Sequence, residues 1–133
     1  MRSGILLMVL FLSFSAVSVY GSNTGTKKRL VNEQIVVLNL VEGIESGNCG
    51  LCCCSAVLLG EIGSTDAVIP LMKLFHSDCK TELRIAAAQS LAKIGDPRGL
   101  KLLEYASQYD TDPRVKRFAE IFYRASLAGL IES

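Results

Sequence analysis

The feature that most constrains this chain is a recurrence of similar residues every 32 positions. Leu59-Gly60-Glu61-Ile62-Gly63 matches Leu91-Ala92-Lys93-Ile94-Gly95 without a gap, at an offset of 32 residues. The same offset relates positions 51, 52, 54 and 55 to positions 83, 84, 86 and 87, and these to positions 115, 116, 118 and 119. A fixed period of this length is typical of stacked helical units. The recurrence therefore predicts a repeat protein.

The central copy carries the signals of a helical hairpin. Apolar and small residues at positions 83, 86, 87, 90, 91 and 94 fall at three- and four-residue intervals, which is the pattern of an amphipathic helix. Gly95 should end this helix, because glycine accepts the left-handed conformation. Asp96 should cap the next helix and Pro97 should begin it. Each copy is thus a first-type helix followed by a second-type helix, here with buried positions at Leu100, Leu103 and Ala106.

The neighbouring copies carry similar signals for the ends and starts of helices. Gly63 should end the first-type helix of the preceding copy, and Ser64 stands at the capping position of Asp96. The second-type helix that follows has its apolar stripe at Val68, Leu71, Met72 and Phe75. Asp112-Pro113 opens the third copy, whose stripe comprises Val115, Phe118, Ala119, Phe122 and Tyr123.

A further helix is expected before these copies. Apolar residues recur at helical spacing over 31–44, and Ile35-Val36-Val37 lies 32 residues before Ala67-Val68-Ile69. This segment corresponds to a second-type helix without its first-type partner. The prediction is an all-α fold, a short α-solenoid of helical hairpins: one capping helix, two complete hairpins and one closing helix. Stacking buries the apolar stripes that a single pair would leave exposed.

The N-terminus has the organisation of a signal peptide. Met1-Arg2 gives a basic start, an apolar run covers 5–14, and small residues follow at peptidase spacing. We expect a signal peptide over 1–21, cleaved after Gly21 or alternatively after Ser18. The apolar run is shorter than the ~20 residues that a membrane span needs. The protein is then exported, periplasmic or secreted, from a bacterial source. No stable membrane span remains after cleavage, and a flexible junction over 22–29 leads to a repeat domain over 30–128.

Charge and motifs argue against several functional classes. The chain has 14 basic and 13 acidic residues, and Arg2 of the leader accounts for the difference, so no basic field is available for nucleic acid. No Gly-x-Ser-x-Gly turn or phosphate-binding loop is present. His76 is the sole histidine, which leaves zinc short of ligands. The sequence predicts a protein-binding scaffold, with no catalytic residues, cofactor or metal. Its surface ridge for the protein partner would comprise Arg84, Lys116 and Arg117.

Five cysteines are the unusual feature of the composition. Cys49 and Cys52 have the spacing of a redox or metal pair at a helix start, where thiol pKa values are lowered. In an exported chain the commonest fate of cysteines is a structural disulfide, and Cys79 could reach Cys49 or Cys52 across adjacent loops. Cys53 belongs to the same candidate disulfide or redox group. Cys54 aligns with Ala86 and is expected to be a small buried residue. The alternative function is a thiol-based redox or metal-handling protein that uses the Cys49–Cys54 cluster.

The central copy resembles a known repeat. The segment Leu83-Arg-Ile-Ala-Ala-Ala-Gln-Ser-Leu-Ala-Lys-Ile-Gly-Asp-Pro97 is similar to the HEAT-like repeat, in the short form found in phycocyanobilin lyases and many bacterial proteins. The resemblance rests on the hydrophobic-Arg pair, the paired small residues and the Ile-Gly-Asp-Pro turn. It implies an interaction scaffold, since lyase activity belongs to only some members. The first copy departs from the pattern, because Cys52 stands where the family has arginine.

Overall fold

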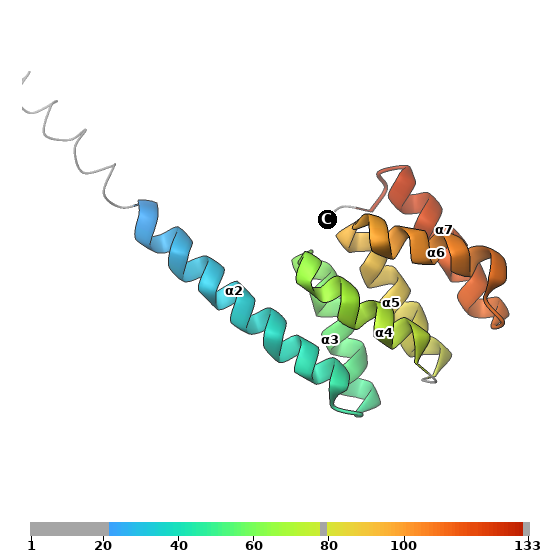
Figure 1. The fold of residues 1–133 in the computed structure, drawn as a ribbon, viewed down its shortest axis with the longest axis horizontal. Coiled ribbons are helices and arrows are strands. Elements are labelled where there is room, and N and C mark those ends of the chain that lie inside the picture. The colour runs from blue at the N-terminus through green and yellow to red at the C-terminus, as the bar shows by residue number, and fades with distance from the viewer. Residues whose placement is uncertain (1–21, 78–79, 132–133) are drawn as a thin grey trace, which may run out of the picture. The chain divides into compact units, whose positions relative to one another are not determined.

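The computed structural model describes residues 22–77 and 80–131, with side chains from residue 32 onward. These ranges contain six α-helices, one 3-10 helix and no strand: α2 (Ser22–Glu45), α3 (Cys49–Ile62), η1 (Thr65–Ala67), α4 (Val68–His76), α5 (Thr81–Ile94), α6 (Pro97–Tyr109) and α7 (Pro113–Leu127). The predicted all-α solenoid of one capping helix, two hairpins and one closing helix is confirmed (Figure 1).

Two compact units divide the chain, one over Met1–Val36 and one over Val37–Ser133. In the first unit the described part is the N-terminal portion of α2, and the predicted signal peptide over 1–21 lies outside the described residues. Helix α2 begins at Ser22, so the described structure is helical where a flexible junction was expected over 22–29, and the domain bounds stay a prediction. Once a helix has nucleated over the apolar segment that follows, each added residue costs little, so the helix extends through this stretch.

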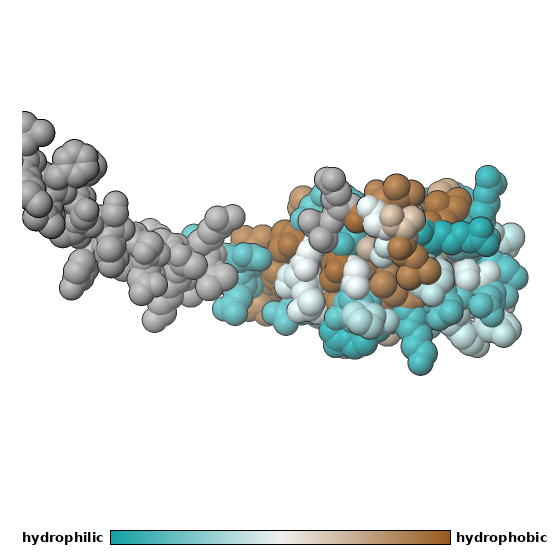
Figure 2. All heavy atoms as spheres, turned by 90° about the horizontal axis from the view of Figure 1, so that it is seen from above, coloured by the Kyte–Doolittle hydropathy of each residue, from teal (hydrophilic) through white to brown (hydrophobic). Residues whose placement is uncertain are grey.

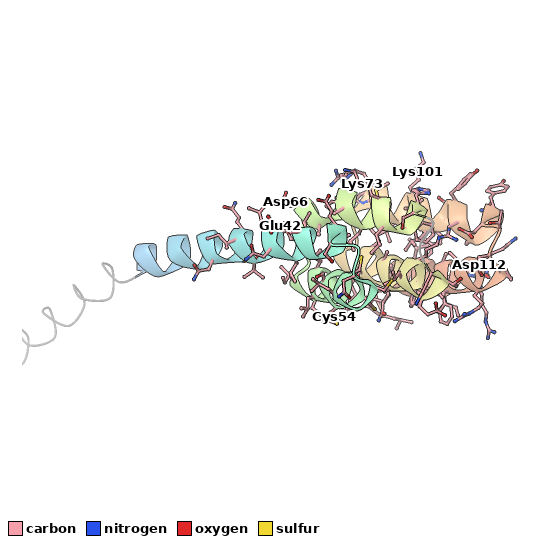
Figure 3. All side chains as sticks on the ribbon, turned by 90° about the horizontal axis from the view of Figure 1, so that it is seen from below. Glu42, Cys54, Asp66, Lys73, Lys101 and Asp112 are labelled. Carbon is pink, nitrogen blue, oxygen red and sulfur yellow. The ribbon has the colours of Figure 1, made fainter. Side chains whose placement is uncertain are left out.

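The second unit is built as two layers of helices. The first-type helices α3, α5 and α7 form one layer, and the second-type helices α4 and α6 form the other (Figure 3). Helix α5 is central, since it contacts α3, α4, α6 and α7. Small side chains make this possible: Ala87 and Ala88 are completely buried, and Ala92 nearly so. The core of α5 comprises Leu83, Ala86, Ala87, Ala88, Ser90, Leu91 and Ala92.

Most of the predicted helix boundaries are confirmed. Gly63 and Gly95 end α3 and α5 with φ of 72° and 70°, in the left-handed conformation that favours glycine. The side chains of Asp96 and Asp112 cap α6 and α7 by accepting hydrogen bonds from backbone N–H groups of the first turn. In both helices proline occupies the first turn, as expected.

The first copy begins and continues differently from the prediction. Asn48 caps α3 through its side chain, so Cys49 lies in the first turn of the helix rather than in the preceding loop. Ser64 precedes η1, but its side chain makes no capping hydrogen bond. The 3-10 turn replaces the Asp-Pro start of the other copies. It leaves α4 as the short helix Val68–His76.

The third copy is less buried than its alignment suggests. Val115 and Ala119 are completely buried, whereas Phe118 is exposed and Phe122 and Tyr123 are partly buried. Helix α7 is the last helix of the described stack and packs mainly against α5 and α6. Part of its aromatic stripe therefore reaches solvent.

Helices α3 and α5 approach most closely at Gly60. A Cβ atom at this position would lie 2.8 Å from the Cα atom of Ser90. Ser90 is buried and its hydroxyl donates to the carbonyls of Ala56, at 2.7 Å, and of Ala86, at 3.0 Å. Two backbones thus meet where neither carries a bulky side chain. Ala92, 32 positions after Gly60, is also small and buried.

We expect Gly60→Ala to lower the free energy of unfolding. The added methyl group would press on the Ser90 backbone, which costs about 1–3 kcal/mol when a packed interface cannot relax. This exceeds the gain of up to ~1 kcal/mol from replacing glycine inside a helix. Thermal unfolding of Gly60→Ala and Gly50→Ala checks the prediction. Gly50 faces only the Asn48 side chain, at 3.4 Å, and should tolerate alanine. Equal melting midpoints for the two variants would contradict the close approach.

Candidate functional site

One position of the repeat has the same role in all three copies. Its side chain donates a hydrogen bond to a carbonyl in the last turn of the preceding second-type helix. The bonds run from Cys52 Sγ to Ile44 O (2.9 Å), from Arg84 Nε to Phe75 O (2.8 Å) and from Lys116 Nζ to Gln108 O (2.9 Å). The final carbonyls of a helix have no partner within that helix, so each donor completes the helix end.

Arg84 is committed to this internal role. Its guanidinium forms a two-point ion pair with Asp110, with Nη1–Oδ1 at 3.2 Å and Nη2–Oδ2 at 2.5 Å. The same group lies 5.0 Å from the centroid of the Phe75 ring. Both charged side chains are largely buried. Arg84 therefore joins α4, α5 and the α6–α7 connection, a role that sequence reasoning missed. Lys116 and Arg117 are exposed, and the partner-binding ridge stays a prediction.

Further polar contacts follow the repeat period. Arg114 Nη1 pairs with Glu82 Oε1 at 3.0 Å, and these residues occupy equivalent positions in adjacent copies. Lys93 pairs with its own equivalent, Glu61. The Asp112 carboxylate accepts a hydrogen bond from the Thr81 hydroxyl at 2.6 Å. This bond, followed by the backbone N–H of Arg114, lowers the pKa of Asp112. The carboxylate that caps α7 also holds the start of α5.

The cysteines differ in burial and contacts. Cys49, Cys53 and Cys54 carry free thiols, and Cys52 is buried with its thiol on the Ile44 carbonyl. The prediction that Cys54 is buried is wrong: it lies exposed at the outer edge of the first-type layer (Figure 3). Among the described residues no first-type helix precedes α3, so none lies against Cys54 in the way that α3 lies against α5. Cys79 lies outside the described residues, and so does the predicted bridge.

The described ranges contain no group of three or more His, Cys, Asp or Glu side chains that could hold a metal ion. Within the same residues, no helix combines the length and apolar character needed to cross a membrane. The contacts of Cys49, Cys52 and Cys53 thus lend no support to a metal-handling or redox site.

The N-terminal end of the stack is apolar. On α3, Leu51 is 49% exposed, Leu58 is 50% exposed and Cys54 lies exposed between them. Their equivalents on α5 pack against α3 and are almost fully buried: Leu83 4%, Ala86 9% and Ser90 2%. We call Leu51, Cys54 and Leu58 the end face. It is the surface on which a preceding first-type helix would pack.

The opposite end of the stack carries an ion pair beside exposed apolar residues such as Ile121. Ala56 and Gly60 of α3 face α5, and the corresponding residues of α7 are Glu120 and Arg124. These two are exposed and form an ion pair at 2.8 Å. A polar outer surface is what a terminal repeat needs in water. The two ends of the first-type layer therefore differ: the end face is made of apolar side chains and a thiol, whereas α7 carries an ion pair. Seen from above in Figure 2, the second unit carries apolar patches beside polar ones.

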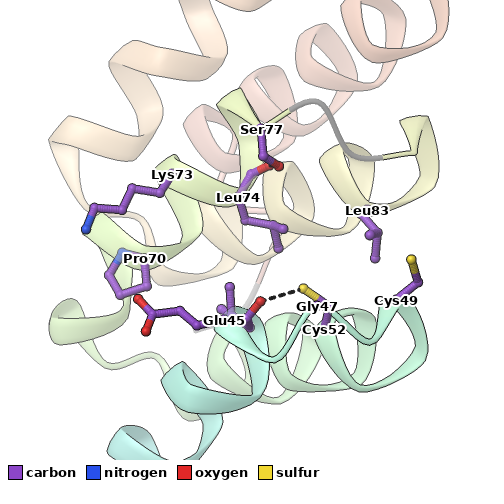
Figure 4. Close-up of a pocket in the computed structure, with 10 residues that line it drawn as sticks. Glu45, Gly47, Cys49, Cys52, Pro70, Lys73, Leu74, Ser77 and Leu83 are labelled. Carbon is purple, nitrogen blue, oxygen red and sulfur yellow. Dashed lines mark hydrogen bonds between the residues drawn. The ribbon is translucent and has the colours of Figure 1, made fainter.

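A pocket of about 260 Å³ lies between the end of α2, the start of α3 and helices α4 and α5 (Figure 4). Leu74, Leu83 and Pro70 form its apolar walls, and the thiols of Cys49 and Cys52 face it. The full lining is Ile44, Glu45, Gly47, Cys49, Cys52, Pro70, Lys73, Leu74, Ser77 and Leu83. Among the predicted site residues, the structure brings Cys49 and Cys52 together here and keeps Arg84 in the next copy.

Replacing Arg84 with methionine should destabilise the fold by about 2 kcal/mol. The change keeps most of the apolar stem but leaves the Asp110 carboxylate buried without its partner, and loss of one partner from a buried pair is costly. Arg114→Met is the matched control, since its pair with Glu82 is exposed and should contribute less than about 1 kcal/mol. Chemical denaturation of both variants measures the difference. Similar losses would refute the bridging role of Arg84.

Comparison with known families agrees with this architecture. The family model for HEAT repeats matches residues 40–121, which is more than half of the chain. The match includes α3 to α6 and most of α7. None of the curated proteins matches the chain. On the extent of the repeat match, the chain belongs to the HEAT repeat family.

Proposed function

We propose that this protein is an exported scaffold that binds a partner protein through the end face. The observation that carries the proposal is the exposure of Leu51, Cys54 and Leu58 at positions whose equivalents in the next copy are buried. Apolar surface that stays exposed at the end of a stack marks an interaction site. The two leucines and the thiol form a single helical stripe at spacings of three and four residues.

A helix of the partner is the ligand that best fits this stripe. Each interface within the stack places one helix on the corresponding face of the next, with small and apolar residues at the contact. Complete burial of a leucine side chain stabilises by about 1.5–3 kcal/mol, and both leucines are already half buried. The end face would thus supply a few kcal/mol, so the partner must also contact neighbouring surface.

A second copy of this chain fits less well. Head-to-tail stacking would place the exposed Glu120–Arg124 pair of one molecule on Leu51 and Leu58 of the next, at the cost of desolvating the pair. A face-to-face dimer would rest on three side chains per molecule. That falls well short of the roughly 800 Å² per partner that a stable interface buries.

The binding test introduces a negative charge at one end of the stack or at the other. A photo-reactive residue at position 58 of the intact protein, in its native host, should crosslink to a helical segment of another protein. Leu51→Glu should reduce affinity for that protein at least tenfold, because it places a charge on the apolar stripe. Ile121→Glu, a half-exposed position on α7, should bind normally. Crosslinks to a second copy or to residues 22–36 of the same chain would overturn the proposal. Equal loss in both variants would do so as well.

Export is proposed on the leader alone. The basic start, the apolar run over 5–14 and the small residues that follow support secretion to the periplasm or the medium. The Leu83–Pro97 motif supports placing the repeats with the short form of the phycocyanobilin-lyase type, without its activity. Mass spectrometry of protein recovered from the host should find an N-terminus at Ser22 or, alternatively, at Val19. Full-length chains confined to the cytoplasm would refute export.

A further inference from the structure

We propose that the pocket at the start of the first copy receives an arginine side chain from outside the chain. This site is separate from the end face, because the pocket has its own lining residues and would bind a different kind of group. The argument rests on the comparison of two copies of the repeat within one molecule. Where the second copy has Arg84, the first has Cys52 and an open space.

The second copy shows what this space holds when it is filled. Arg84 extends from the start of α5 across the end of α4, donates to the Phe75 carbonyl and covers the Phe75 ring. Cys52 occupies the equivalent position on α3 and makes a similar bond, to the Ile44 carbonyl in the last turn of α2. A cysteine side chain is several atoms shorter than an arginine side chain. The volume that the longer side chain takes up in the second copy is therefore pocket in the first.

The end of α2 offers acceptors for a guanidinium group. The C-terminal end of a helix is its negative end, and the last turn of α2 contains no basic residue. Glu45 adds a carboxylate to the lining. The Ile44 carbonyl has a second lone pair beside the one that accepts the Cys52 thiol. In the second and third copies, Arg84 and Lys116 supply a cation at the corresponding helix end.

The walls of the pocket suit the stem of the same side chain. Pro70, Leu74 and Leu83 present apolar surface along it, as the Phe75 ring does to Arg84. Lys73 is the cation among the lining residues, and in Figure 4 it lies on the Glu45 side of the pocket, across from Cys49 and Leu83. Arginine suits the site better than lysine, because its planar fork donates to a carbonyl and a carboxylate at once.

The test uses a small probe, Nα-acetyl-arginine amide, with the lysine and norleucine amides as comparison compounds. Methyl NMR signals of Leu74 and Leu83 in the intact protein report on the pocket. The arginine probe should shift both signals in a saturable titration. The lysine probe should bind at least threefold more weakly, and the norleucine probe should give no saturable shift. Because the probe replaces any partner protein, the outcome does not depend on the end face.

Two variants and a control complete the test. Cys52→Arg should fill the pocket from within, as in the second copy, and abolish binding of the probe. Glu45→Gln changes an exposed residue, so the fold is retained, and it should weaken binding severalfold. Glu42→Gln, on the same helix but outside the lining, should bind as the parent does. The proposal is overturned if norleucine amide binds as tightly as the arginine probe. It is also overturned if no probe saturates, or if Glu45→Gln and Glu42→Gln behave alike.

Discussion

The stack depends on the hydrogen bond that each first-type helix gives to the end of the preceding second-type helix. Arg84 makes the most extensive version of this contact. Its side chain donates to the Phe75 carbonyl, pairs with Asp110 and covers an aromatic ring. A helix end buried without such a donor would cost the desolvation of its carbonyls. The bond also fixes the separation of consecutive hairpins, since donor and acceptor belong to different elements. Cys52 and Lys116 make the same connection with shorter or more exposed side chains.

Much of the fold could be predicted from the sequence because its signals are local. Gly95 and Asp96 determine one boundary through their own conformational and hydrogen-bonding preferences, and both behave as expected. The junction over 22–29 could not be predicted in this way, since a helix extends from a neighbouring segment without requiring an apolar stripe of its own. At Ser64 a local signal was misleading. The residue type suits a helix cap, but a 3-10 turn follows and the Ser64 hydroxyl makes no capping hydrogen bond.

The candidate sites were harder to predict, since they arise from neighbours rather than from residue types. Leu51 aligns with Leu83, and nothing in either residue says that one is exposed and the other buried. The available signal was the missing first-type helix ahead of α3, which the repeat count already implied. Aligning Cys54 with Ala86 assumed that both have neighbours on two sides. Arg84 was assigned to a surface ridge because its acceptors, Phe75 and Asp110, are distant in sequence and become neighbours only in the fold.

The ion pair between Glu120 and Arg124 makes it harder to add a further repeat after α7 than before α2. A designer who wished to lengthen the protein beyond α7 would first have to exchange both residues for small ones, as in Ala88 and Ala92 of the preceding copy. Ahead of α2 no such exchange is needed, because Leu51 and Leu58 are already suited to receive another helix. New modules can therefore be joined at the N-terminal side of the stack with the existing surface unchanged.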